Sequence, residues 1–309
     1  MKASEDRSFL RAMMRPRNIS QLPRLIFAFV KCYRNWYSAL YKIAITELPV
    51  DFVTNDGHHL RSNSPLQFVA LASLLGEHWK MSDIQGHFLT IRNGVAIKCR
   101  FDVGYDIGHV KEIFVDEVYG SGFEGKKVLD IGTSNGDSAV YFAGKGARIV
   151  VGVEPFAESY DLASENVRQN GFGGVVKLVN MALSSVSGEG KLAVAPLAPN
   201  INALDSVGGV TADGRIHAKV ATTTLEALMS DFNLETVDFL KMDCEGCEYE
   251  VLSNTPHRVL AKIGEVVLEF HRGPGDLPRI LTRSGFDVSV RGKTVGYIRA
   301  IRTTTVQGI

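Results

Sequence analysis

The sequence predicts an α/β protein with a doubly wound, mostly parallel seven-stranded sheet that closes with an antiparallel C-terminal hairpin. Three observations lead to this fold class. Apolar runs of strand length alternate with helical stretches in the second part of the chain, as consecutive βαβ units require. A glycine loop joins the first of these runs to a helix, and acidic residues follow several of the runs. Open α/β sheets bind their ligands at that edge, where the strands end.

The first βαβ unit contains the predicted cofactor loop. Val128–Ile131 is apolar on both faces, which is typical of a buried parallel strand. Two glycines follow and allow the backbone to turn sharply beside a ligand, and a helix begins at Ser138. The residues of this unit that we expect to bind the cofactor are Asp130, Gly132, Thr133, Asn135, Gly136, Asp137 and Ser138.

The second strand indicates which cofactor this is. Arg148–Val153 is rich in β-branched residues and ends at Glu154, about twenty residues after the loop, where a carboxylate can bind ribose hydroxyls. The loop has the spacing D-x-G-x-x-x-G from Asp130 and lacks the dinucleotide pattern G-x-G-x-x-G. It resembles the loop of class I S-adenosylmethionine (SAM) methyltransferases, so we expect Glu154 and Pro155 to contact SAM. A nicotinamide oxidoreductase is the alternative.

Composition narrows the class of protein. The chain has 309 residues, with 34 basic and 34 acidic side chains, and this balance disfavours a general nucleic-acid binder. Four cysteines do not make a secreted disulfide framework, so we expect a reducing compartment and a cytoplasmic protein. No segment is apolar over the length of a membrane span.

Residues 1–110 are predicted to form an extension of a basic tail, a long helix and small hairpins. Residues 1–42 carry nine Lys or Arg and two acids, and we expect the tail to be poorly ordered. Leu22–Ile45 is predicted to be one amphipathic helix with a basic stripe and a wide aromatic face. We favour packing of this face on the protein or on a second copy in a homodimer. Peripheral contact of residues 22–45 with an anionic membrane is the alternative.

The rest of the extension is predicted to be small and to cover the binding site as a lid. Asn-Asp-Gly and Asn-Gly sequences mark two hairpin turns. The predicted elements are strands 51–54 and 59–61, helix 64–75, strands 88–91 and 96–101, and helix 110–119.

Residues 111–309 are predicted to be the cofactor-binding domain. Asn180, Met181 and Ala182 follow the third strand, whose end faces the adenine in a SAM-binding fold. The loop 196–214 is rich in Pro, Asn and Gly, and we expect it to cover the substrate. The predicted elements after the second strand are helix 157–169, strand 175–179, paired strands 191–194 and 216–222, helix 224–230, strand 237–242, helix 248–252, strand 265–270, helix 277–283 and the closing pair 286–290 and 296–302.

These stretches resemble the FkbM family of SAM-dependent methyltransferases from about residue 112 to residue 302. The most specific match is the run Lys241-Met-Asp-Cys-Glu-Gly-Cys-Glu248, which contains the family's lysine-x-Asp-x-Glu-Gly-x-Glu pattern in full. The resemblance implies O-methylation of a hydroxyl on a sugar, a lipid or a secondary metabolite. It does not cover residues 1 to about 100. The other matching stretches are 128–138, 152–155, 165–166 with 170–171, 180–184, 223–225 and 267–271.

The ends of the fourth and fifth strands are predicted to carry the catalytic residues. Asp243 follows the fourth strand, while Glu269 and His271 end the fifth and share one of its faces. Histidine has an unperturbed pKa suited to a base near neutral pH, and an alcohol acceptor must lose its proton. Lys241 lies on the face of Asp243. We predict Asp243, His271, Glu269 and Lys241 as catalytic, with Asp243 also at the cofactor.

Two other interpretations of this region stay open. Glu245 either contributes to catalysis or simply caps the following helix. Asp243, Glu269 and His271 are a plausible ligand set for a divalent ion that binds the acceptor hydroxyl. We nevertheless assign no metal ligands.

Cys244 and Cys247 form a C-x-x-C sequence, which is found in redox pairs and in zinc sites. No second C-x-x-C is present, and Cys32 and Cys99 are far away in the sequence. The FkbM resemblance accommodates both residues as variable positions, so we favour neither role. A protein of this fold that binds SAM without turnover is the remaining functional alternative.

Overall fold

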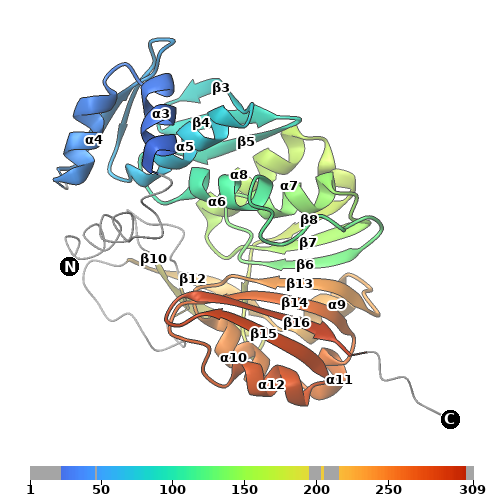
Figure 1. Cartoon of the computed structure of the whole chain (residues 1–309). Coiled ribbons are helices and arrows are strands. Elements are labelled where there is room, and N and C mark those ends of the chain that lie inside the picture. The colour runs from blue at the N-terminus through green and yellow to red at the C-terminus, as the bar shows by residue number, and fades with distance from the viewer. Residues whose placement is uncertain (1–21, 46, 195–202, 205–215, 304–309) are drawn as a thin grey trace. The chain divides into compact units, whose positions relative to one another are not determined.

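The computed structural model describes residues 22–45, 47–194, 203–204 and 216–303 (Figure 1). They fall into two compact units, Met1–Val118 and Tyr119–Ile309. The predictions for the basic tail and for most of the loop 196–214 lie outside the described residues. In the described part of the chain, each helix is too short or too polar to cross a bilayer.

The N-terminal unit contains helices and two small antiparallel sheets. The first sheet is β1-β2 and the second is β3-β4-β5, so both predicted hairpins are present. The sequence did not predict β3, whose side chains are all exposed or half-buried and show no apolar alternation. The elements are α3 Leu22–Cys32, α4 Trp36–Ala44, β1 Val50–Val53, β2 His59–Ser62, α5 Leu66–Gly76, β3 Lys80–Gln85, β4 Phe88–Asn93, β5 Val95–Arg100 and α6 Asp106–Phe114.

The prediction of one helix over Leu22–Ile45 is wrong, because α3 and α4 are separate. Between them the backbone of Tyr33 forms an antiparallel bridge with Thr54. The side-chain oxygen of Asn35 accepts a hydrogen bond of 2.8 Å from the amide of Val53. The chain therefore leaves the helix to pair with β1, and this tertiary contact overrides a periodicity that favoured one helix.

The second unit is built on a seven-stranded sheet in the order β15-β16-β14-β13-β6-β7-β8. The five strands from β14 to β8 are parallel and β16 is antiparallel to both of its neighbours, which confirms the predicted fold class. The elements of this sheet and its helices are β6 Lys127–Ile131, α7 Asp137–Gly144, β7 Ile149–Val153, α8 Ala157–Gln169, a 3₁₀ turn Phe172–Gly174, β8 Val176–Val179, α9 Leu225–Asp231, β13 Val237–Met242, α10 Cys247–Asn254, α11 His257–Leu260, β14 Ile263–Phe270, α12 Leu277–Arg283, β15 Phe286–Gly292 and β16 Gly296–Arg302.

A smaller sheet in the order β11-β10-β12-β9 belongs to the same unit. The predicted pairing of its two long strands is confirmed, since Val194 lies opposite Ile216 in an antiparallel register. Its strands are β9 Ala182–Leu183, β10 Gly188–Val194, β11 Ala203–Leu204 and β12 Ile216–Thr223.

The strand order fixes the position of the site. The chain runs outward from β6 to β7 and β8, and then returns to β13 on the other side of β6. Ligands of open α/β sheets bind where the order reverses, beyond the carboxyl ends of the strands. In this sheet that point lies between Ile131 and Met242, which are paired residues at the ends of β6 and β13.

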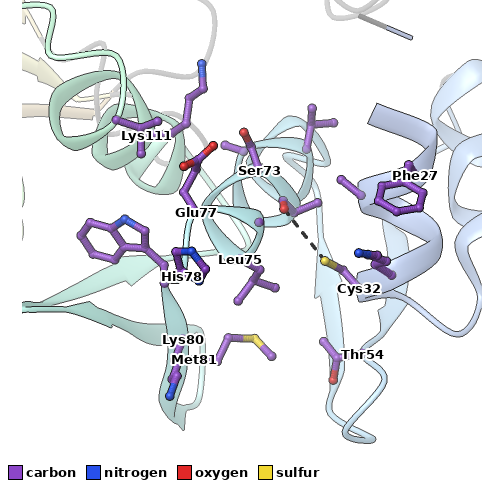
Figure 2. A pocket seen from close by; sticks show the side chains of 18 of the residues that line it. Phe27, Cys32, Thr54, Ser73, Leu75, Glu77, His78, Lys80, Met81 and Lys111 are labelled. Atoms are coloured by element: carbon purple, nitrogen blue, oxygen red, sulfur yellow. Dashed lines mark hydrogen bonds between the residues drawn. The ribbon is translucent and has the colours of Figure 1, made fainter. Parts of the chain in front are cut away.

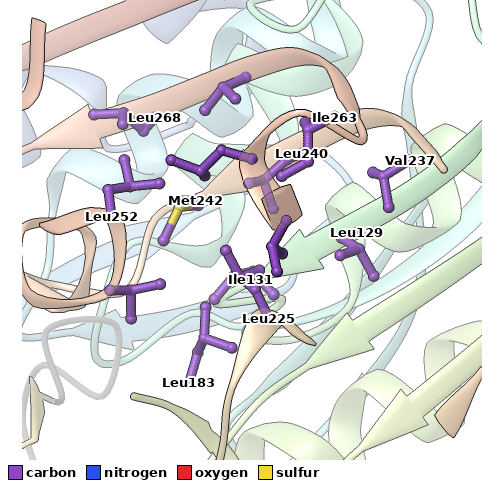
Figure 3. Packing of buried hydrophobic residues seen from close by; sticks show 14 of the residues in the cluster. Leu129, Ile131, Leu183, Leu225, Val237, Leu240, Met242, Leu252, Ile263 and Leu268 are labelled. Carbon is purple, nitrogen blue, oxygen red and sulfur yellow. The ribbon is translucent and has the colours of Figure 1, made fainter. Parts of the chain in front are cut away.

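The two faces of the large sheet pack differently, because successive side chains of a strand point to opposite sides. Leu129, Leu240 and Met242 form one buried cluster with Leu225 of α9 and Leu252 of α10 (Figure 3). Burial of each such side chain contributes about 1.5–3 kcal/mol. This packing holds the ends of β6 and β13 rigidly together.

The opposite face has an aromatic cluster. The ring of Phe239 on β13 lies 5.0 Å from that of Phe123 and 5.6 Å from that of Phe142 on α7, measured between centroids. The first pair is edge-to-face and the second is tilted, and aromatic pairs of this kind add about 0.5–1.5 kcal/mol beyond their buried area. The cluster fixes α7, and with it the glycine loop that precedes this helix.

Candidate active site

The glycine loop lies directly against the loop that follows β13. Gly132 has a φ of 74°, and a Cβ atom at this position would lie 1.8 Å from the carbonyl oxygen of Asp243. The amide of Asp243 in turn donates a 3.0 Å hydrogen bond to the carbonyl of Ile131. Gly136, with a φ of 82°, leaves only 2.8 Å between such a Cβ and the Cα of Ala163. Glycine is therefore required at both positions by neighbouring backbone.

Asp130 is the centre of the hydrogen bonds that shape this loop. Its Oδ2 accepts hydrogen bonds from the hydroxyls of Thr133 and, at 2.6 Å, Ser138. Its Oδ1 lies 3.1 Å from the Nζ of Lys241, and that Nζ donates a 2.5 Å hydrogen bond to the carbonyl of Gly132. Asp130 is fully buried, so it stabilises the conformation of the loop through these hydrogen bonds and does not face solvent.

Lys241 was predicted to be catalytic, but its ammonium is tied to the glycine loop. Burial alone lowers the pKa of Lys241, and the carboxylates of Asp130 and Asp243 outweigh burial and raise it. The side chain therefore stays protonated at neutral pH and is unsuited to act as a base. We assign it a positioning role between β13 and β6.

The other loop residues predicted to bind the cofactor are also inside the protein. Their side chains are at most 3% exposed, so the loop has only its backbone and the side chain of Ser134 to offer to a ligand through this stretch. The buried side chains are those of Thr133, Asn135, Asp137 and Ser138.

Glu154 follows β7 and turns toward the glycine loop. Its Oε2 accepts a 2.9 Å hydrogen bond from the amide of Ser134, and its Oε1 accepts one of 2.9 Å from the amide of Phe156. The side-chain amide of Asn180 donates to the carbonyls of Glu154 and Pro155, at 2.9 and 3.2 Å. These bonds join the ends of β7 and β8 around one carboxylate.

Beyond Asn180, the two other residues predicted near the adenine differ in exposure. Met181 is half-buried, whereas Ala182 is buried and begins β9. Among the three, Asn180 and Met181 therefore have side chains that can reach a ligand.

The three acidic and basic side chains predicted at the ends of β13 and β14 come together. One ligand atom each from Asp243, Glu269 and His271 lie within 4.8 Å of one another, and all three residues are half-buried. The Nε2 of His271 is 3.6 Å from an Oε1 of Glu269 and 3.6 Å from an Oε1 of Glu245. The cluster thus places an imidazole between two carboxylates beside the loop that holds Gly132.

Glu245 does not cap α10. Gly246 is the N-cap residue of this helix, and Glu248 is the residue whose carboxylate accepts a backbone hydrogen bond here, from the amide of Cys244. Glu245 adopts a left-handed φ of 58°, which is uncommon for a residue with a side chain. Of the two interpretations left open by the sequence, the structure supports a place in the His271 cluster.

The sequence model of the methyltransferase FkbM domain matches residues 130–288, just over half of the chain. The chain belongs to the FkbM methyltransferase family. The predicted resemblance is confirmed, and membership of this methyltransferase family supports SAM as the cofactor.

Two curated relatives are each 28% identical to the chain. One is the AMB antimetabolite synthetase AmbE of Pseudomonas aeruginosa, matched over 59% of this chain and 10% of that protein. The other is the methyltransferase sdnD of Sordaria araneosa, matched over 58% of this chain and 81% of that protein. The chain thus spans a small part of the first relative and most of the second.

Two solved structures are also similar. The FkbM methyltransferase of Methylobacillus flagellatus is 17% identical with a TM-score of 0.42, over 59% of this chain and 46% of that one. The magnesium protoporphyrin IX methyltransferase of Synechocystis, solved with SAM, is 13% identical with a TM-score of 0.37. This match covers 63% of this chain and 79% of that one.

The residues around the glycine loop of this FkbM-family chain fit SAM. The hydroxyl of Ser134 is buried and has no hydrogen-bond partner within the described ranges, and the residue lies midway between Gly132 and Gly136. Each carboxylate oxygen of Glu154 can accept a further hydrogen bond beside the one from the backbone. Ser134 and Glu154 therefore offer an acceptor-rich place for ribose hydroxyls. Sequence reasoning missed Ser134, which no spacing rule distinguishes from its neighbours.

Tyr119 is a second residue that the sequence did not indicate. Burial raises the pKa of its hydroxyl well above the usual range, and the carboxylates of Asp243, Asp130 and Asp137 raise it further. The phenol therefore stays neutral in the field of the site's acids. It comes from the segment before β6, where no motif marks it.

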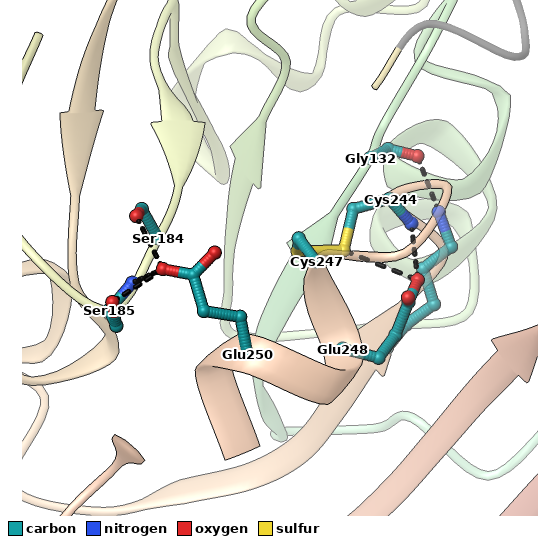
Figure 4. The surroundings of a disulfide bond; sticks show 8 residues. Gly132, Ser184, Ser185, Cys244, Cys247, Glu248 and Glu250 are labelled. Atoms are coloured by element: carbon teal, nitrogen blue, oxygen red, sulfur yellow. Dashed lines mark hydrogen bonds between the residues drawn. A yellow bond between two sulfur atoms is a disulfide. The ribbon is translucent and has the colours of Figure 1, made fainter. Parts of the chain in front are cut away.

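The sulfurs of Cys244 and Cys247 are joined in a disulfide, which the sequence analysis did not predict (Figure 4). The pair closes the loop between Asp243 and α10. The sequence offered only the C-x-x-C spacing, which does not distinguish a disulfide from free thiols or zinc ligands.

The N-terminal unit contains a cavity of about 1330 Å³ between α3, α5 and β3 (Figure 2). Its lining mixes apolar side chains such as Phe27 and Leu75 with charges of both signs, including Lys80 and Glu77. The Sγ of Cys32 on its wall lies 3.9 Å from the carbonyl of Ala72. Among the described residues, no group of three potential metal ligands like that of Asp243, Glu269 and His271 lies on this wall.

Proposed function

We propose that this protein is a SAM-dependent O-methyltransferase that transfers a methyl group to a hydroxyl of a sugar, a lipid or a secondary metabolite. The observation that carries the proposal is the cluster of Asp243, Glu269 and His271 at the point where the strand order reverses. The cluster is next to the glycine loop, so a base would lie beside the methyl donor.

Bound SAM supplies a methyl group already activated by its sulfonium. Glu154 and Ser134 would bind the ribose hydroxyls of SAM, and Asp243 would also contact the cofactor. Asp130 and Lys241 fix the position of the glycine loop through their ion pair and the hydrogen bond from Lys241 to the carbonyl of Gly132. Holding donor and acceptor in line can supply roughly 7–11 kcal/mol of the barrier reduction, so these positioning contacts are central to the rate.

His271 removes the proton from the acceptor hydroxyl. The carboxylates of Glu245 and Glu269, each 3.6 Å from its Nε2, stabilise the imidazolium that forms. General-base assistance of this kind contributes about 10²–10⁴ in rate. A divalent cation bound by Asp243, Glu269 and His271 is the alternative, since it would lower the pKa of the hydroxyl directly.

The test is transfer of an isotope-labelled methyl group from SAM to fractionated glycan, lipid and small-molecule extracts. We expect label in one alcohol-bearing fraction and none with Asp243→Asn. If calorimetry shows SAM binding but no fraction is labelled, the protein binds SAM without turnover. If NAD binds and SAM does not, the oxidoreductase alternative is correct.

The partners we propose are the small acceptor and a surface contacted by residues 22–45. Half of the aromatic face of this segment packs inside the N-terminal unit, where Phe29 and Tyr33 are fully buried. The other half is exposed: Phe27, Tyr37 and Tyr41 keep 58%, 67% and 64% of their surface. We propose that the protein is cytoplasmic and that an anionic membrane or a second copy of the chain covers these rings.

A further inference from the structure

The disulfide Cys244–Cys247 occupies the loop that carries the site residues Asp243 and Glu245. The other two cysteines, Cys32 and Cys99, are free thiols in the N-terminal unit. A disulfide between residues three apart adds little to the stability of a fold, because the loop it closes in the unfolded chain is very short. Its position therefore suggests a chemical role.

We propose that Cys244 and Cys247 are a redox-active pair that undergoes thiol–disulfide exchange with a dithiol reductant, with Glu248 as its proton carrier, and that its oxidation state controls the His271 cluster. The pairing and its exchange are independent of the activity proposed above. Only the consequence for methyl transfer rests on that activity.

The two sulfurs differ in access. Cys244 is half-buried, whereas Cys247 is 3% exposed and is the first residue of α10. An incoming thiolate therefore attacks the sulfur of Cys244 and forms a mixed disulfide with it. The bond between the two cysteines breaks, and the sulfur of Cys247 leaves with the electron pair as a thiolate, which the N-terminal end of α10 stabilises.

Glu248 lies where a proton is needed in the second step. Its Oε1 is 3.3 Å from the Sγ of Cys244 and accepts a 2.8 Å hydrogen bond from the amide of Cys244. The side chain is fully buried, and its Oε2 has no hydrogen-bond partner in the described part of the chain. Burial, opposed by backbone hydrogen bonds and aided by the charge of Asp243, raises the pKa of Glu248 to about 7, so it carries a proton near neutral pH.

The second thiolate of the reductant then attacks the reductant's first sulfur, which is bonded to Cys244 in the mixed disulfide. The sulfur of Cys244 leaves with the electron pair and takes the proton of Glu248. The two protons released by the dithiol restore Glu248 and neutralise Cys247. Two electrons pass to the protein, the dithiol becomes a disulfide, and the protein gains two thiols.

The loop links this exchange to the cluster. Glu245 and Gly246 lie inside the ring closed by the disulfide, and both have positive φ values, 58° and 118°. Opening the ring allows Glu245 to leave the left-handed region, which is disfavoured for residues with a Cβ. Its carboxylate then withdraws from the imidazole of His271.

The first experiment follows the thiols alone. The full chain is equilibrated in glutathione buffers that range from the poise of the secretory pathway to that of the cytosol, and thiols are trapped and counted by mass spectrometry. We expect a two-electron transition of Cys244 and Cys247 within this range, while Cys32 and Cys99 stay reduced. A pair that remains fully oxidised or fully reduced throughout overturns the proposal.

Two variants test the role of Glu248. Reduction of Glu248→Gln by dithiothreitol at pH 7 should be about 10²-fold slower than that of the wild type. Glu250→Gln is the matched control, because Glu250 on the same helix binds Ser184 and Ser185 instead of the disulfide (Figure 4). Circular dichroism verifies that both variants fold. Equal rates in the two variants would remove Glu248 from the mechanism.

The link to the site is measured without any acceptor. The imidazole resonances of His271 in isotope-labelled wild-type protein should differ between the oxidised and reduced forms, and those of the exposed His257 should not. Identical His271 spectra would refute control of the cluster. Because neither thiol trapping nor these spectra need methyl transfer, failure of the proposed activity would leave both readouts intact.

Discussion

At the scale of single residues, Glu154 is the side chain on which SAM affinity should depend most. Glu154→Ala removes acceptors for the ribose and also frees the amides of Ser134 and Phe156. We expect SAM binding to weaken by roughly 1–3 kcal/mol, the cost of losing hydrogen bonds to a charged group. Titration calorimetry measures it, with Glu158→Ala on the exposed side of α8 as the control. Unchanged affinity would show that the ribose is bound elsewhere.

His271 is the residue that should decide turnover. His271→Ala removes the base, so we expect turnover to fall by roughly 10²–10⁴ while SAM affinity stays near that of the wild type. His257→Ala changes an exposed histidine and should have no effect. Wild-type turnover in the His271 variant would place the base elsewhere. Loss of activity in EDTA that a divalent ion restores would instead favour the metal alternative.

At the scale of elements, the N-terminal unit depends on a buried ion pair between β5 and α6. Two nitrogens of Arg100 donate to the carboxylate of Asp106, at 2.9 and 3.1 Å, and both side chains are at most 1% exposed. Asp106→Ala removes the buried carboxylate that accepts these two hydrogen bonds from the guanidinium. We expect a loss of about 3–5 kcal/mol in the free energy of unfolding, measured with urea.

The control for this loss is the surface pair of Lys111 and Asp116, whose side chains are 32% and 40% exposed. Asp116→Ala should cost no more than about 1 kcal/mol. Similar losses in the two variants would mean that the Arg100 side chain finds other partners or water.

The start of α10 should make stability depend on pH. Glu248 has a pKa of about 7 in the folded protein and 4.5 as its ordinary value. Between these values the folded state holds a proton that the unfolded state has lost. The contribution of Glu248 to the free energy of unfolding is therefore highest below about pH 4.5. It falls by about 3 kcal/mol as the pH rises to about 7.

Glu248→Gln should abolish this decline, and denaturant unfolding at several pH values measures it. Glu235→Gln on the surface is the control and should keep the decline. A Glu248 variant whose stability follows the wild-type pH profile would contradict the assignment.

At the scale of the whole molecule, the sheet was readable from the sequence because its pattern is local. Runs such as Val237–Met242 are apolar and bounded by turns, and the structure reproduces this strand residue for residue. The break at Tyr33 was not readable, since it depends on Thr54 in a later strand.

The site shows the same division. Spacing alone placed Asp243, Glu269 and His271 at neighbouring strand ends, because parallel strands end at one edge. It did not indicate that Asp130 and Lys241 pair inside the protein, which requires the register between β6 and β13. Sequence patterns thus predicted which residues belong to the site, but they did not predict the role of each residue.

The exposed rings of α3 and α4 lead to a prediction for the intact protein. Anionic liposomes should retain it at low salt and release it at high salt, because buried apolar area and basic residues act together at such a surface. The triple variant Phe27→Ser, Tyr37→Ser, Tyr41→Ser should not float with the liposomes. A truncation is unsuitable, since it would remove the buried Phe29 and Tyr33.

If the wild type and the triple variant float alike, membrane contact through these rings is refuted. A decrease in the apparent mass of the triple variant in gel filtration would then favour a homodimer.

The contact of Gly132 with the carbonyl of Asp243 has a consequence for how this chain can change over generations. Two positions 111 residues apart share one space, so no side chain can appear at the first unless the backbone at the second moves. Selection on the acceptor can therefore alter the residues that follow Asp243, but it cannot displace that carbonyl while the loop keeps its shape. An engineer who wishes to change specificity inherits the same constraint.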